Sequence, residues 1–400
     1  MTVTEFSARN NRVLFVIPVI GTGGAELQAL LQIAALRRRG LEISLLVLSR
    51  NSDPAVRARL ALPADRLCEL ANRSDVLDRE FLLDLPGTIG RASAFAATRG
   101  CATVVAHLPA AHVFSRLLKI ALLARGRRVR LYQYHHSEER RLAPLDTLAK
   151  RLFFAADQGL ARLCDHAHLH VSEAVRADVA GGMFTRRDAV LHNTCDMDSE
   201  GDHAAAEALL EPARQGGNPF LVLLPGRLLT LKGHALLLRA LRPLIAREGL
   251  TAGDIQVVFA GGGPARGAIE ATVRDTGLGE HVTLLGSVPH QTLLALYQAA
   301  DLVVVPSLIE GFGIVAIEAL SRGALLIASD AAGLDEIVRP GRNALQFPAG
   351  DERALAALLA EVWVRRGETI IERGGLRAEM AARFGIDAHI DRLLALIGDG

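Results

Sequence analysis

Aromatic residues and net charge are both scarce in this chain of 400 residues. Phe, Trp and Tyr together make up 4% of it, which is too little for a surface that stacks against an oligonucleotide. The formal net charge is only +1, from 45 basic and 44 acidic residues. A chain so evenly balanced is not the polycation that a nucleic-acid backbone attracts. We therefore expect no nucleic-acid partner.

Paired cysteines and long apolar runs are missing as well. The four cysteines lie far apart with no Cys-x-x-Cys pair, which favours buried thiols over disulfides or a zinc site. No uninterrupted apolar stretch reaches the roughly 18–20 residues that a transmembrane helix needs. The first residues lack the cationic-then-apolar pattern of a signal peptide. These absences predict a cytoplasmic protein.

Short apolar runs that alternate with helical patterns are abundant. The length exceeds one comfortable core and predicts two domains. Strands are expected at 12–18, 42–48, 102–107, 129–134, 166–171 and 189–192, and again at 220–224, 256–260, 282–285, 302–305 and 325–328. A polar, glycine-bearing stretch at 200–218 is the candidate linker.

This alternation predicts an α/β fold of two doubly wound Rossmann-like domains that face each other across a cleft. We expect the domains over residues 1–205 and 206–382, followed by a C-terminal helix over 383–400 that could pack back on the first domain. After the first strand, a glycine loop leads into a helix with Leu27, Leu30, Leu31 and Ala34 on one stripe.

Residues 301–320 are the most informative segment. An apolar run ends at Pro306, as a buried parallel strand does, and Glu310, a Gly-Phe-Gly turn, a helix start and Glu318 follow. The free N–H groups of a helix start bind anions. The pattern predicts a nucleotide-sugar site, with the diphosphate on the helix and hydroxyls on the two acids. Earlier in the chain, Arg227 and Lys232 share one loop from which both can reach a phosphate.

Four motifs together resemble a known family. Gly226-Arg227-x(4)-Lys232-Gly233, then 259–264, then 282–288, then Glu310-Gly-Phe-Gly-x(4)-Glu318-Ala resemble the large family 4 of retaining glycosyltransferases. Gly23-Gly24-Ala-Glu26 and Val171-Ser-Glu173 agree with its first domain. The resemblance implies the two-Rossmann GT-B architecture and a nucleotide-diphosphate sugar as donor. It also implies transfer with retained configuration, no bound metal and no cofactor.

The resemblance also implies a role for individual positions. Arg227 and Lys232 would neutralise the departing diphosphate, Glu310 would face the transferred sugar, and Glu318 would hold the ribose. A histidine after a first-domain strand would contact the sugar; His135 and His136 both qualify, and His135 is the preferred one. The remaining expected substrate contacts are Gly23, Gly24, Gly286, Val288, Phe312, Gly313, Ile314 and Val315.

The expected acceptor is the hydroxyl of a glycan or of a lipid-linked glycan. The alternatives are a sugar-nucleotide epimerase or hydrolase on the same fold, a non-catalytic nucleotide-binding relative, and an NAD-dependent dehydrogenase. Residues 116–130 hold many cations among leucines and no acid. They fit a basic helix lying peripherally on the anionic inner face of the cytoplasmic membrane, and equally a core-packed helix with a cationic last turn.

Two segments imitate metal sites. Cys164, His166, His168 and His170 alternate, so the three histidines would line one face of a strand, and we favour a structural or interdomain role over a metal. Asp196-Met-Asp198 resembles the metal-binding Asp-x-Asp of other glycosyltransferases. It follows Asn193, however, at a place where a turn is the better interpretation.

Overall fold

The computed structural model describes residues 11–21, 23–72, 84–138, 146–214, 217–339, 341, 344–366, 368 and 375–398. These residues fall into two compact units, unit 1 within 1–194 and 386–400, and unit 2 within 195–385. The domain boundaries expected at 205/206 and 382/383 fall inside two helices, α10 (His203–Arg214) and α17 (Leu376–Phe384).

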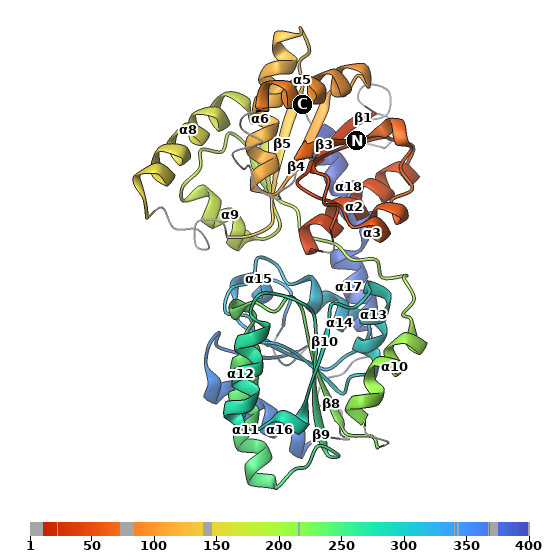
Figure 1. Ribbon diagram of the computed structural model, residues 1–400, viewed down its shortest axis with the longest axis vertical. Coiled ribbons are helices and arrows are strands. Elements are labelled where there is room, and N and C mark those ends of the chain that lie inside the picture. The colour runs from red at the N-terminus through yellow and green to blue at the C-terminus, as the bar shows by residue number, and fades with distance from the viewer. Residues whose placement is uncertain are drawn as a thin grey trace. The chain divides into compact units, whose positions relative to one another are not determined.

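Unit 1 is a parallel sheet of seven described strands in the order β3-β2-β1-β4-β5-β6-β7, with helices on its faces (Figure 1). The strands are β1 (Arg12–Ile17), β2 (Glu42–Ser49), β3 (Leu67–Asn72), β4 (Thr103–His107), β5 (Arg130–His135), β6 (Ala167–His170) and β7 (Asp188–Val190). The helices are α2 (Gly24–Arg38), α3 (Pro54–Arg59), α5 (Leu85–Thr98), α6 (Pro109–Ala124), α8 (Leu148–Cys164), α9 (Glu173–Ala180) and α18 (Ile386–Gly398), with a short 3-10 turn η1 (Ala64–Arg66).

Unit 2 repeats this plan with six described parallel strands in the order β10-β9-β8-β11-β12-β13. The strands are β8 (Phe220–Pro225), β9 (Ile255–Ala260), β10 (Val282–Gly286), β11 (Leu302–Val305), β12 (Leu326–Ser329) and β13 (Leu345–Phe347). Besides α10 and α17, the helical elements are η2 (Thr230–Lys232), α11 (His234–Glu248), α12 (Arg266–Thr276), η3 (Gly279–His281), α13 (His290–Ala299), α14 (Ile314–Ser321), α15 (Ala332–Asp335) and α16 (Glu352–Val364).

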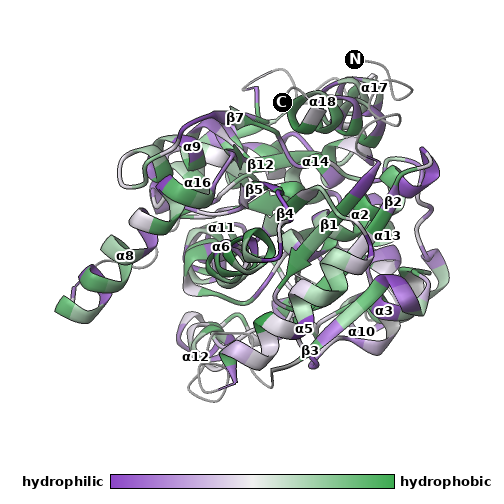
Figure 2. Cartoon of the chain, turned by 90° about the horizontal axis from the view of Figure 1, so that it is seen from above, coloured by the Kyte–Doolittle hydropathy of each residue, from purple (hydrophilic) through white to green (hydrophobic). Residues whose placement is uncertain are grey.

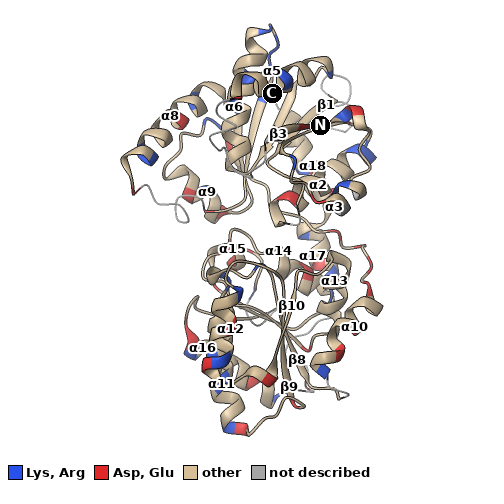
Figure 3. Cartoon of the chain, in the orientation of Figure 1, with Lys and Arg blue, Asp and Glu red and all other residues tan. Residues whose placement is uncertain are grey.

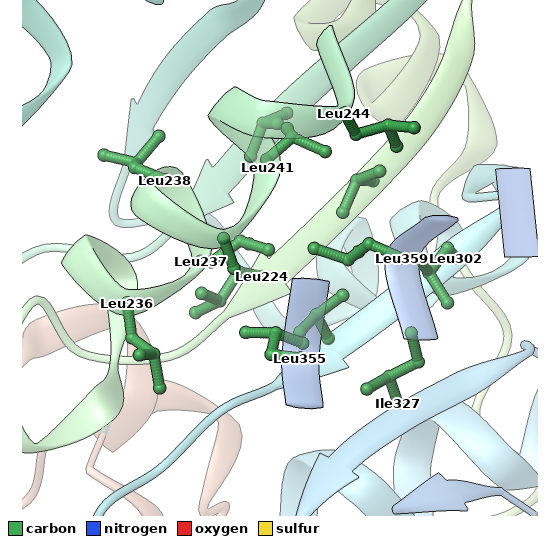
Figure 4. Packing of buried hydrophobic residues seen from close by; sticks show 14 of the residues in the cluster. Leu224, Leu236, Leu237, Leu238, Leu241, Leu244, Leu302, Ile327, Leu355 and Leu359 are labelled. Carbon is green, nitrogen blue, oxygen red and sulfur yellow. The ribbon is translucent and has the colours of Figure 1, made fainter. Parts of the chain in front are cut away.

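The cores follow from the apolar strands. In unit 2, leucines of α11 such as Leu237 and Leu241 pack against Leu224 of β8, Leu302 of β11 and Leu355 of α16 (Figure 4). Most charged residues lie on helices and loops rather than on strands (Figure 3). A strand that is buried on both faces has no place for an unpaired charge. Charged side chains near the sheets are therefore found mainly where strands end.

Each of the eleven expected strands is confirmed within one or two residues. Two strands were missed: β3, whose sequence Leu-Cys-Glu-Leu-Ala-Asn mixes polar and apolar residues, and β13, which has only three residues. The fold class is confirmed, since all strand pairs in both sheets are parallel, with helices in between.

The stripe expected on α2 is confirmed only in part. Leu30 is buried, but Ala34 is exposed, and the buried residues also include Gln28 and Gln32. The side-chain amide of Gln28 donates to the Thr194 carbonyl at 2.5 Å, and that of Gln32 lies 3.0 Å from Nε2 of His389 in α18. The helix therefore packs on both the sheet and α18, and polar residues can be buried there because they are hydrogen-bonded.

The 116–130 segment is partly internal. Arg116 of α6 is fully buried and forms ion pairs with Asp157 and Asp165. Lys119 donates to the Cys164 carbonyl at 2.5 Å. The core-packed interpretation therefore holds for these two cations, whereas Arg125 and Arg127 are exposed after the helix end. Within the described residues, no helix combines the length and apolar character needed to cross a bilayer.

Candidate functional site

Two loops of unit 2 that are far apart in sequence meet beyond the carboxyl ends of β8 and β11. The N–H of Leu308 donates to the Leu231 carbonyl at 2.8 Å. Gly233 has a φ of +75°, and a Cβ atom there would lie 2.0 Å from the carbonyl oxygen of Pro306. A side chain at this position would thus separate the loops. Glycine here is what lets the 230–233 turn reach the loop that carries Glu310.

Lys232 and Glu310 form an ion pair at this meeting point. Nζ of Lys232 lies 2.6 Å from Oε2 of Glu310, and the side chains are 25% and 11% exposed. The hydroxyl of Ser307 donates to the same oxygen at 2.8 Å. Ser307 is itself held in place, because Ser329 donates to its carbonyl at 2.6 Å. Glu310 thus has one charged and one uncharged donor on a single oxygen.

Arg227 adds a second cation at the end of β8. Its side chain is exposed and makes no hydrogen bond or ion pair with the described residues. The turn around it is held by glycine contacts: a Cβ atom on Gly261 would lie 1.9 Å from the carbonyl oxygen of Gly226. The N–H of Leu228 donates to the Gly262 carbonyl at 2.9 Å. The backbone is therefore fixed while the guanidinium is left accessible to a ligand.

The turn into α14 is supported by α15. Gly313 has a φ of +99°, and a Cβ atom on it would lie 2.5 Å from Leu334. The N–H of Gly333 donates to the Glu310 carbonyl at 3.1 Å. Phe312 is buried, with its ring 5.6 Å from that of Phe384. Within the described residues no hydrogen bond uses the N–H groups of Ile314 and Val315, so both are available to an anion.

Glu318, on the second turn of α14, is buried and already hydrogen-bonded. Its Oε1 accepts from Nε2 of His290 at 2.8 Å, and its Oε2 accepts from the Tyr297 hydroxyl at 3.0 Å. The hydrogen bond to Glu318 raises the pKa of His290. Burial, together with the same carboxylate, raises the pKa of Tyr297 well above its usual range. This carboxylate is thus held by two donors from α13.

Sequence reasoning missed His290 and Tyr297. They are seven residues apart in α13, a spacing that places both on one face of a helix. That spacing was the available signal, but a buried tyrosine more often marks a core. Gly286, with a φ of +73°, and the partly exposed Val288 precede His290 at the end of β10. Both of these expected residues lie in the segment that leads into α13.

The histidines of unit 1 form a buried stack. His135 is 1% exposed, and its ring lies 5.2 Å from each of the rings of His168 and His170. Its Nε2 is 3.0 Å from Nδ1 of His168. Burial lowers the pKa of His135 well below its usual range and that of His170 to about 2. His135 and His170 are therefore neutral at physiological pH.

His135, the histidine preferred for the contact with a sugar, thus lies inside this buried stack. His136, the next residue, is partly exposed, and its Nε2 lies 2.9 Å from Nδ1 of His107. Burial lowers the pKa of His136 to about 3. Its Nδ1 is buried and has no hydrogen-bond partner among the described residues. Of the two expected candidates, His136 is the more exposed one.

Gly23 and Gly24 lie at the start of α2. Gly23 is extended, with a φ of −69°, and is the residue before the helix. A Cβ atom on it would lie 2.2 Å from Oε2 of Glu26. Both glycines have some exposed surface. The Glu26 carboxylate thus lies directly beside the backbone of Gly23 at the start of α2.

The segments that imitate metal sites behave as turn and core. Oδ1 of Asp196 accepts from the N–H groups of Asp198 and Ser199 at 3.0 and 3.2 Å, which confirms the expected turn. His168 and His170 belong to the buried stack. Among the described residues, no group of three or more His, Cys, Asp or Glu side chains is arranged to hold a metal ion.

Comparison with known sequences identifies similar proteins. A family model described as glycosyl transferases group 1 matches residues 207–368. D-inositol 3-phosphate glycosyltransferase 1 of Catenulispora acidiphila is 30% identical over 290 residues, which cover 69% of this chain and 68% of that protein. The match thus extends well beyond unit 2.

Solved structures match almost the entire chain. Anabaena HepE in complex with UDP and glucose is 19% identical, with 97% of this chain and 99% of that chain covered and a TM-score of 0.78. Sucrose-phosphate synthase of Thermosynechococcus elongatus is 21% identical, with coverage of 97% and 98% and a TM-score of 0.75. At these identities the likeness concerns the fold, and it confirms the expected GT-B architecture.

Proposed function

Because this chain belongs to the group 1 glycosyltransferases, we propose that it moves a sugar from a nucleoside-diphosphate sugar to an acceptor hydroxyl with retained anomeric configuration. The observation that carries the proposal is the meeting of Lys232 and Glu310 beside the start of α14. A cation, a carboxylate and free helix N–H groups are the parts that cleavage of a sugar–diphosphate bond requires.

The diphosphate gains negative charge when the bond to the sugar breaks. Lys232, Arg227 and the N–H groups of Ile314 and Val315 would stabilise that charge, and the backbone N–H groups are fixed before the reaction begins. Lys232 is paired with Glu310. A diphosphate would attract its ammonium group, while Ser307 can keep Glu310 in place.

The transferred sugar becomes cationic at its anomeric carbon as the bond breaks. The carboxylate of Glu310 would stabilise this centre and bind sugar hydroxyls. The acceptor oxygen would form the new bond to the anomeric carbon on the face from which the diphosphate departs. Its proton would pass to the departing phosphate oxygen. The transfer therefore needs neither a metal ion nor a cofactor.

Other residues would orient the substrates. Glu318 would accept hydrogen bonds from the ribose hydroxyls, and Gly286 and Val288 would border the base. Phe312 and Gly313 shape the turn that presents the α14 N–H groups. From unit 1, His136 would bind a sugar hydroxyl, and Gly23 and Gly24 would admit donor or acceptor close to the backbone. A glycan or lipid-linked hydroxyl is the proposed acceptor.

Donor binding gives the first test. HepE was solved with UDP-glucose, so UDP, UDP-glucose, GDP-mannose and NADH form a suitable panel for calorimetry. We expect a UDP- or GDP-linked sugar to bind and NADH not to bind. Lys232→Ala should weaken nucleotide binding roughly tenfold or more, because it removes a charged hydrogen bond to phosphate.

Arg239→Ala is the matched control, since Arg239 forms an exposed ion pair with Glu352 elsewhere in unit 2. It should bind donor as the wild type does. Product mass on sugar acceptors, including inositol phosphates, then separates transfer from hydrolysis or epimerisation. Anomeric coupling constants of the product report retention, and addition of EDTA tests metal independence. Tight NADH binding alone, or full activity of Lys232→Ala, would contradict the proposal.

A further inference from the structure

The outward side of α8 is apolar although it is exposed. Leu148, Leu152 and Leu163 are 73%, 63% and 81% exposed. Together with the exposed Ala155 and Gly159 they recur every three or four residues, so all five share one side of the helix. We refer to these five residues as the outer stripe of α8.

The inner side of α8 accounts for the packing of this helix. Asp157, Ala161 and Cys164 are its buried residues. Asp157 pairs with Arg116, and the Cys164 carbonyl accepts from Lys119, so α6 holds the inner side. The first half of the helix extends past the rest of unit 1, and its far end is hydrophobic (Figures 1 and 2). The outer stripe is therefore not a core face of unit 1.

The exposed charges on α8 all have one sign. Lys150, Arg151 and Arg162 are exposed, whereas the one acid within the helix, Asp157, is buried against Arg116. Lys150 lies on the side away from the outer stripe and pairs with Asp146, just before the helix, at 2.7 Å. Arg151 and Arg162 lie eleven residues apart, about three turns, on the same edge of the outer stripe. An apolar stripe with a cationic border is the pattern of a helix that lies in a membrane interface.

We propose that α8 docks the protein onto an anionic phospholipid surface. The outer stripe would enter the boundary between headgroups and acyl chains, and Arg151 and Arg162 on its edge would contact lipid phosphates. A second copy of this chain fits the stripe less well. Pairing two such faces would bring like charges together, and α8 presents no exposed acid to meet them. The proposal does not depend on which sugar or acceptor is used.

Vesicle sedimentation with the full chain tests the proposal. The probes are vesicles of phosphatidylcholine alone and of phosphatidylcholine with phosphatidylglycerol. We expect binding to the anionic vesicles to be at least tenfold tighter and to weaken as salt is added. The double variant Leu152→Glu and Leu163→Glu should bind the anionic vesicles at least tenfold more weakly than the wild type. Both positions are exposed, and unchanged circular dichroism will verify folding.

Two control variants sharpen the result. Val364→Glu changes a 68% exposed residue of α16 and should bind vesicles as the wild type does. Leu123→Glu probes the end of α6, where the basic 116–130 segment is exposed, and should lose less than threefold. The tryptophan fluorescence of Leu152→Trp should shift to the blue when anionic vesicles are added. The buried Trp363 should contribute a constant background.

Three outcomes would overturn the proposal. The first is a wild-type protein that does not sediment with anionic vesicles. The second is a double variant that sediments as the wild type does. The third is a wild-type dimer that the double variant converts to a monomer without a change in vesicle binding, because the outer stripe would then join two copies. Donor binding by the double variant is expected to be unchanged, which separates this test from that of the proposed function.

Discussion

Both units carry polar side chains near the carboxyl edge of a parallel sheet, but in opposite states. In unit 1, His135 and His170 are the last residues of β5 and β6 and are buried and neutral. In unit 2, Lys232 and Glu310 lie on loops past β8 and β11, where both are partly exposed and oppositely charged. A displacement of a few residues past the strand end thus decides whether a group is packed in the core or available to a substrate.

The difference in burial also sets what each group can do. Buried His135 and His170 stay neutral because desolvation, the largest influence on both, opposes their charge. A partly exposed Lys–Glu pair keeps its charges at little cost and can exchange partners. We therefore expect substitutions in the unit 1 cluster to change stability, and substitutions in the unit 2 cluster to change activity.

The largest expected effect is on the stability of unit 1. Arg116→Ala would leave Asp157 and Asp165 buried without their cation, which should cost about 3–5 kcal/mol of unfolding free energy. Denaturant unfolding measures it. The matched control is Arg266→Ala, which removes the exposed pair with Glu270 and should cost less than about 0.5 kcal/mol. Equal costs for the two variants would remove burial as the explanation.

The next effect is on catalysis in unit 2. Glu310→Gln keeps the size of the side chain but removes the charge that faces the sugar, so kcat should fall about 100- to 1000-fold. Steady-state transfer assays measure this loss, with Glu352→Gln as the control in the exposed pair with Arg239. The thermal midpoint should move by only a few degrees. Near-normal turnover would show that Glu310 does not contact the reacting sugar.

Acid should destabilise unit 1 through its histidines. An unfolded histidine takes up a proton near pH 6.5, whereas buried His170 stays neutral down to a pKa of about 2. The unfolded state then binds more protons, so stability falls as the pH falls below about 6.5. Each such histidine should cost about 1.4 kcal/mol between pH 7.5 and 5.5. In His170→Phe, the loss of unfolding free energy between pH 7.5 and 5.5 should be smaller than in the wild type by about 1.4 kcal/mol. An unchanged loss would show that His170 is not a group that causes it.

The smallest effect concerns His290 and has the opposite sign. Its pKa is raised by Glu318, so its contribution to stability is fully present below about pH 6.5 and is lost as the pH rises through the raised value. His290→Gln keeps an N–H donor but not the charge. The variant should be less stable than the wild type by up to about 1 kcal/mol at pH 6 and nearly equal at pH 9. A difference in unfolding free energy between the wild type and the variant that grows with pH would contradict the raised pKa of His290.

Local patterns in the sequence were sufficient for the architecture. Apolar strands ending at residues such as Pro306, glycine turns and helix periodicity act over a few residues, and they predicted eleven strands and the parallel fold. The motifs that carry Arg227, Lys232, Glu310 and Glu318 were also visible, because each is a short run. Helix periodicity did not predict the buried face of α2. The glutamines buried there depend on contacts with Thr194 and His389, which lie more than 150 residues away in the sequence.

Only the tertiary structure decided which polar residues are accessible. Neighbouring His135 and His136 are indistinguishable by type, and Arg116 reads as a surface cation until Asp157 and Asp165 are placed beside it. Likewise, the ion pair of Lys232 with Glu310 spans 78 residues and exists because Gly233 lets two loops touch. Burial and partners are properties of long-range contacts, so the chain determined the groups it carries while packing determined their charge and access.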